Sequence, residues 1–160
     1  QIDLYFDNSA NLHRKNLMSI NQLIYSSSAS KKMLKSDLYI ILRQARKNNE
    51  SIGVTGLLIY ADKYFFQVLE GRKEVVSQLF EKISNDKRHY DVQILGESEL
   101  DIRAFPNWKM AYATPSDREL ATWAGLHSTT TVEATLNRLK SESSRVAEFL
   151  SNVLEKSSLS

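Results

Sequence analysis

The chain has 160 residues, a formal net charge of +2, and a composition that is 42% hydrophobic and 25% charged. These values are typical of one globular domain, and so small a charge does not indicate binding to nucleic acid or to an anionic membrane. Cysteine is absent, which excludes disulfides, thiolate catalysis and Cys-ligated metals and fits a cytoplasmic protein. The longest apolar run, 54–61, is far shorter than the ~20 residues of a membrane helix.

Three segments of the chain differ in pattern. Residues 1–17 show no clear periodicity, and we interpret them as an N-terminal extension or a non-native leader without assigned function. Residues 18–113 alternate between the periods of strands and helices and form the predicted core. Residues 114–160 predict a C-terminal helical extension for output or oligomerisation.

The core predicts the order strand, helix, strand, strand, helix, strand, followed by a fifth strand. With right-handed crossovers this order gives an α+β fold: a ferredoxin-like βαββαβ sandwich with an added fifth strand and C-terminal helices. Both core helices then cover one face of the sheet and leave a groove between them. The predicted strands are 22–26, 54–60, 64–69, a fourth that begins at 92–95, and 108–113. The first predicted helix starts at 36–37 and fades at 48–49 and Gly53, and the second lies between Gly71 and Asp86.

The last segment predicts a short helix over 116–123 and then a longer amphipathic one. Apolar residues from Val132 to Val153 follow the helical 3/4 spacing, with a break expected at Ser143. This apolar stripe must cover something, and two candidates remain open at this point. They are the free face of the sheet and a second chain.

One residue of the strand 64–69 does not fit an apolar strand. Alternation places Gln67 on the same face as Phe65 and Leu69. A buried amide without partners costs about 1–3 kcal/mol. We therefore expect either specific partners for Gln67 or a face that is partly open to water.

Motifs for catalysis, metal binding and RNA binding are weak. The histidines at 13, 89 and 127 are scattered, and neither a nucleophile elbow nor a phosphate-binding loop is present. RNA binding on such a sheet needs paired aromatics with a basic-glycine-aromatic string. Tyr25 and Phe66 could imitate the pair, but the string is missing.

Uncharged hydrogen-bonding side chains converge on the groove instead. Asn48 and Asn49 lie at the expected end of the first helix, Tyr25 on the first strand and Gln67 on the third. Apolar walls with a few convergent amides predict a site for a flat heteroaromatic ligand. Each residue also has a purely structural explanation, such as a helix cap for Asn49 or a core aromatic for Tyr25.

Five strings, in this order and at this spacing, resemble the BLUF family of flavin-based blue-light sensors. The resemblance covers about Ile20 to Ala113, and the strings at 53–56 and 67–71 weigh most. The five strings are LIYSS at 23–27, NN at 48–49 with GVTGLL at 53–58, FQVLEG at 66–71, DKRH at 86–89 and FPNWKM at 105–110.

The resemblance implies a blue-light photoreceptor, not an enzyme, that binds FAD or FMN non-covalently between the two helices. Light would drive proton-coupled electron transfer from Tyr25 to the flavin through Gln67, and the rearranged hydrogen bonds would reach Trp108, Met110 and the C-terminal helices. The cofactor-binding residues carried over are Tyr25, Ile41, Ala45, Asn48, Asn49, Gln67, Lys82, Ile83, Asp86, Arg88, His89 and Met110.

Within that site the resemblance places Asn49 at the polar edge of the ring, and Arg88 and His89 toward the ribityl chain or phosphate. Family members often carry serine where this chain has Ala45, so one ring contact is expected to be missing or filled by water.

The expected partners are the flavin, a downstream signalling protein that the sequence does not name, and further copies of the chain in a homo-oligomer. We expect no direct contact with nucleic acid or membrane. Residues 114–160 are too few for a cyclase or phosphodiesterase, so output would pass through self-association or a separate partner. The alternatives are a small flavin-dependent oxidoreductase and a flavin-free ferredoxin-like adaptor that oligomerises through its long helix.

Overall fold

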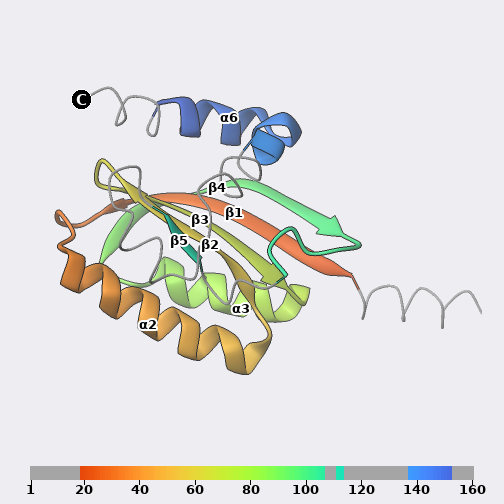
Figure 1. Ribbon diagram of the computed structural model, residues 1–160, viewed down its shortest axis with the longest axis horizontal. Coiled ribbons are helices and arrows are strands. Elements are labelled where there is room, and N and C mark those ends of the chain that lie inside the picture. Colours follow the sequence, from red (N-terminus) through yellow and green to blue (C-terminus); the bar gives the residue numbers. More distant parts are fainter. Residues whose placement is uncertain (1–18, 107–110, 114–136, 153–160) are drawn as a thin grey trace, which may run out of the picture.

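A computed structural model of the chain describes residues 19–106, 111–113 and 137–152. One five-stranded sheet, in the order β4-β1-β3-β2-β5, has α2 and α3 on one face and α6 on the other (Figure 1). The elements are β1 (Ile20–Ala29), α2 (Lys35–Ile52), β2 (Thr55–Ala61), β3 (Tyr64–Gly71), α3 (Lys73–Ser84), β4 (His89–Leu100), β5 (Ala111–Ala113) and α6 (Ser144–Leu150).

The predicted ferredoxin-like order of strands and helices is confirmed. β1, β2, β3 and β4 pair antiparallel, whereas β5 pairs parallel with β2, so the added strand makes the sheet mixed. No helix in the described ranges has both the length and the hydropathy needed to span a membrane. The expected helix over 116–123 lies outside the described residues, as do residues 1–17.

The hairpin between β2 and β3 is closed by a two-residue turn. Asp62 and Lys63 both have positive φ, 51° and 67°, which is the conformation that tight hairpin turns require. This turn pairs Ala61 with Tyr64 and brings Leu58 opposite Gln67. The predicted hairpin is confirmed, with a turn one residue shorter than the expected 61–63 because Ala61 pairs with Tyr64.

Several elements run further than the sequence predicted, among them β1, which spans Ile20–Ala29 instead of 22–26. β4 spans His89–Leu100, whereas the sequence predicted a strand beginning at 92–95; its pairing with β1 runs from Ala29 and His89 to Ile20 and Leu100. The strand lies at the edge of the sheet and is mostly exposed, so an apolar alternation is not needed there. The first helix, which was expected to fade at Asn48–Asn49 and Gly53, continues through both asparagines to Ile52, and Gly53 caps it at a φ of 69°.

The C-terminal helix covers the free face of the sheet, which answers the question left open by its apolar stripe. Val146 and Leu150 of α6 are fully buried against an apolar cluster that includes Phe66 of β3. The Phe149 ring stacks on Phe66 at 5.7 Å between centroids. The break expected at Ser143 is present, since this extended residue caps α6 by accepting the Val146 N–H at 3.3 Å.

Burial of Leu150 predicts its energetic role. Leu150→Ala should destabilise the chain by about 2–5 kcal/mol, because the deleted atoms leave a cavity between α6 and the sheet. Urea unfolding measures this loss. Glu148→Ala on the exposed side of the same helix is the matched control and should change stability by less than about 0.5 kcal/mol. Equal losses in the two variants would contradict the packing of α6 on the sheet.

Candidate functional site

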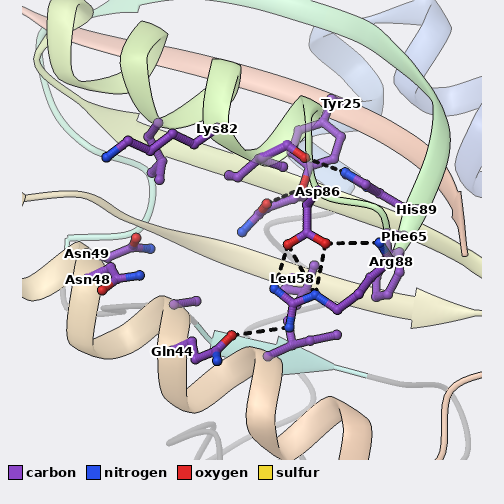
Figure 2. Close-up of a pocket in the computed structure, with 15 residues that line it drawn as sticks. Tyr25, Gln44, Asn48, Asn49, Leu58, Phe65, Lys82, Asp86, Arg88 and His89 are labelled. Carbon is purple, nitrogen blue, oxygen red and sulfur yellow. Dashed lines mark hydrogen bonds and ion pairs between the residues drawn. The ribbon is translucent and has the colours of Figure 1, made fainter.

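A pocket opens between α2 and α3 over the sheet (Figure 2). Its volume is about 210 Å³, less than the ~300–1,000 Å³ of sites that enclose a drug-sized ligand. It would therefore hold a ring system and leave a polar tail outside. The lining residues are Tyr25, Ile41, Gln44, Ala45, Asn48, Asn49, Leu58, Phe65, Gln67, Leu79, Lys82, Ile83, Asp86, Arg88 and His89.

Tyr25 and Gln67 form a buried hydrogen-bonded pair within this lining. They are direct cross-strand partners of β1 and β3, with 3% and 5% of their surfaces exposed. The Tyr25 hydroxyl donates to Oε1 of Gln67. The Tyr25 ring also packs against Phe80 of α3, at 5.5 Å between centroids. Of the two alternatives that the sequence left for the Gln67 amide, the sheet register supports a specific partner.

The electrostatics of the site keep this phenol protonated. Burial raises the pKa of Tyr25 far above its usual value near ~10, and the negative charge of Asp86 raises it further. At neutral pH the Tyr25 hydroxyl is therefore a donor, and the oxygen of Gln67, not its amino group, is turned toward the phenol.

An ion pair and an amide link α2 to the turn after α3. The Arg88 guanidinium donates to Asp86 Oδ2 at 2.6 Å and to Gln44 Oε1 at 3.2 Å (Figure 2). The hydrogen bond from Arg88 holds the pKa of the Asp86 carboxyl below its usual range. This bridge places one positive and one negative group at the pocket.

His89 is held by the protein through both ring nitrogens. Nε2 contacts the Ile83 carbonyl, which can only accept, so Nε2 carries the proton. In the neutral ring Nδ1 then accepts from Ser27 Oγ at 2.7 Å. The ring stands edge-on to Tyr25, at 6.3 Å between centroids. His89 therefore supports the phenol from the β4 side.

The two neighbouring asparagines of α2 differ in exposure. Asn49 is buried, with 2% of its surface accessible, whereas Asn48 is exposed at the pocket rim (Figure 2). Both amides can donate and accept. Lys82 of α3 adds a positive charge to the lining.

The structure brings together nearly all the residues expected at the site. Every cofactor-binding residue carried over from the family resemblance lines this pocket except Met110. Met110 and Trp108 lie outside the described residues.

Four further lining residues were missed, namely Gln44, Leu58, Phe65 and Leu79. Signals for them exist in the sequence. Gln44 lies one helical turn from Asn48, and Leu79 one turn from Ile83. Leu58 follows from the register of the hairpin.

Fold and pocket together define a small α+β domain with a ligand site between the two helices of a ferredoxin-like sheet. The family model described as "BLUF: Sensors of blue-light using FAD" matches residues 20–111. The chain belongs to this family, and the resemblance noted in the sequence is confirmed.

Relatives and solved structures agree with this assignment. The chain is 36% identical, over 109 residues, to photoactivated adenylate cyclase subunit beta of Euglena longa; the match covers 68% of this chain and 12% of that protein. The photo-activated state of BlsA matches with a TM-score of 0.60 and 35% identity, covering 75% and 94% of the two chains. Klebsiella pneumoniae BlrP1 with FMN and cyclic diGMP matches with a TM-score of 0.56 and 33% identity, covering 60% and 26%.

These matches differ in how much of the other protein they span. The chain covers about a tenth of the length of the cyclase subunit and nearly all of BlsA. The activities of the complete cyclase subunit and of complete BlrP1 are therefore not assigned to this chain, which matches only a small part of each.

The ion pair at the pocket predicts a pH dependence of stability. Because the folded-state pKa of Asp86 is lowered, its contribution is complete above the unfolded value of about 3.9 and is lost as pH falls through the folded value. At neutral pH, Asp86→Asn should cost up to about 1 kcal/mol, since both partners are partly exposed. Urea unfolding of both proteins from pH 7 to pH 2 should show this gap closing at the acid end.

The Arg88→Gln background provides the control for this experiment. Without its partner, Asp86→Asn should produce a smaller gap at neutral pH. A gap that stays constant down to the lowest pH would show that the Asp86–Arg88 pair does not contribute in the folded chain.

Proposed function

We propose that this chain is a blue-light sensor that binds FAD or FMN non-covalently in the pocket between α2 and α3. Its response is a changed hydrogen-bond arrangement at Gln67. The buried bond from Tyr25 to Gln67 carries the proposal, because it joins an oxidisable phenol to an amide in the lining of the same pocket.

The lining fits a flavin in shape and polarity. Ile41, Leu79 and Ile83 provide apolar surface for a planar ring. The amides of Asn48 and Asn49 offer donors and acceptors for its polar edge. Lys82 and Arg88 provide positive charge for a phosphate-bearing tail outside the cavity.

A bound flavin supplies absorption of blue light and accepts an electron once excited. Tyr25 would give that electron and pass its hydroxyl proton to the Gln67 oxygen along the existing hydrogen bond, while the Gln67 amide nitrogen would release one of its protons toward the ring. When the electron and a proton return to Tyr25, no substrate has been consumed, and the Gln67 amide is left rotated or tautomerised. The negative charge of Asp86, which raises the pKa of Tyr25, also favours loss of the electron from the phenol.

The position of Gln67 in the sheet supports a route by which the light signal would leave the pocket. Gln67 lies on the central strand β3, whose neighbour β2 pairs with β5. Hydrogen bonds worth about 1 kcal/mol each are enough to bias an element that has two packings of similar energy. We propose that this element is the strand-five region with Trp108 and Met110, and that the signal continues to the C-terminal helices.

Catalysis is not part of this proposal for the chain. The names of relatives link such sensor domains to adenylate cyclases, and we propose that this chain instead acts through self-association or a separate signalling protein. A cytoplasmic location without nucleic-acid or membrane contact stays a prediction. The choice between FAD and FMN is settled by chromatography of the flavin released from the purified protein.

The Tyr25–Gln67 pair predicts a specific loss of the light response. The purified wild-type protein should be yellow and show a reversible red shift of its absorption after blue light. Tyr25→Phe and Gln67→Ala should retain flavin but lose this shift, because each removes one partner of the photoactive bond. Difference spectra recorded in the dark and after illumination measure it.

Tyr90→Phe provides a matched control. This exposed tyrosine of β4 undergoes the same loss of a hydroxyl without contact to the pocket, and its variant should keep the full shift. A full, reversible shift in Tyr25→Phe would refute the assigned pair, and a colourless wild-type protein that takes up no flavin would refute the proposed function.

A further inference from the structure

The connection from β4 to β5 has to cross the whole sheet. β4 and β5 are the two edge strands, so the chain that joins them leads from one edge of the sheet to the other. The described part of this crossover is residues 101–106. An attachment of this crossover to the central strands would stabilise the pairing of β5 with β2.

Glu70 of the central strand provides this attachment. Its side chain is fully buried, and both carboxylate oxygens accept backbone N–H groups of the crossover. Oε1 accepts from Phe105 at 2.8 Å, and Oε2 accepts from Ala104 at 3.1 Å. Oε2 also accepts from the amide of Gln22, the cross-strand partner of Glu70 on β1, at 2.8 Å.

Arg103 holds the same crossover from the other side. Its guanidinium donates to the Gly53 carbonyl at 2.7 Å, to Thr55 Oγ1 at 2.8 Å and to the Glu70 backbone carbonyl at 3.0 Å. The Phe105 ring is 1% exposed and belongs to the apolar cluster beneath α6. The crossover is therefore attached to β2 through Arg103, to β3 through Glu70, and to the apolar cluster beneath α6 through Phe105.

The position of Glu70 links this attachment to the pocket. Gln67 precedes Glu70 by three residues, about 10 Å along the same strand. Alternation directs the Gln67 side chain to the helix-covered face and the Glu70 side chain to the opposite face. A shift of β3 at Gln67 thus reaches the crossover through one continuous strand.

We propose that Glu70 is a positioning residue that couples β3 to the crossover and so carries the change at Gln67 to β5. This inference rests on the proposed light-sensing function. A purely structural Glu70 would hold the crossover equally in the dark and in the light, whereas a coupling residue transmits a difference between the two states.

Glu70→Gln in the full, flavin-loaded chain tests the proposal. An amide has one carbonyl oxygen, so either Ala104 or Phe105 loses its acceptor. Hydrogen–deuterium exchange of peptides covering 101–113, measured in the dark and under blue light, reports on the crossover. In the wild type we expect a light–dark difference there. In Glu70→Gln we expect an unchanged absorption shift, about fivefold faster dark exchange, and no remaining light–dark difference.

Controls separate this inference from the proposed function. Glu81→Gln makes the same chemical change at an exposed position of α3 and should behave as the wild type. If Glu70→Gln does not fold, Glu70→Asp retains the charge but retracts the oxygens from the crossover, and its result is interpreted in the same way.

Three results would overturn the inference alone: a light–dark difference that persists in the Glu70 variant, a wild type that shifts its absorption without any difference at 101–113, or a folded variant that loses flavin or its absorption shift. A wild type that binds no flavin, or shows no absorption shift, would instead overturn the proposed function.

Discussion

The hydrogen bond between Tyr25 and Gln67 depends on the register of β1 against β3. Because side chains alternate along a strand, a slip of one residue would turn Gln67 to the opposite face of the sheet. On the other side of β3, the tight turn at Asp62 and Lys63 fixes the register of β2 against β3 and brings Leu58 opposite Gln67. The geometry of the pocket floor therefore depends on the registers of β1 and β2 against the central strand β3.

The central strand β3 serves both faces of the sheet. Toward α2 and α3 it presents Phe65, Gln67 and Leu69, which border the pocket and its core. Toward α6 it presents Phe66 and Val68 within the second apolar cluster. A displacement of β3 would therefore affect both the pocket beneath α2 and α3 and the apolar cluster beneath α6.

The comparisons place the same folded unit in chains of very different length. It matches nearly all of BlsA but only about a tenth of a cyclase subunit. Among the described residues, the pocket lining comes from the two core helices, the strands they cover and the turn after α3, and it includes no residue of α6.

The sequence by itself determined the features that depend on neighbours along the chain. Alternation identified Gln67 as an amide on an apolar face, and helical spacing placed Ile41 and Ala45 on one stripe with Asn48 or Asn49. The order of the predicted strands and helices gave the fold, and the family strings predicted the lining residues except Gln44, Leu58, Phe65 and Leu79. Tertiary structure alone decided the full length of β4, the parallel pairing of β5, the docking of α6 on the sheet and the attachment of the crossover to Glu70. Each of these depends on contacts between residues far apart in sequence, which local periodicity does not record.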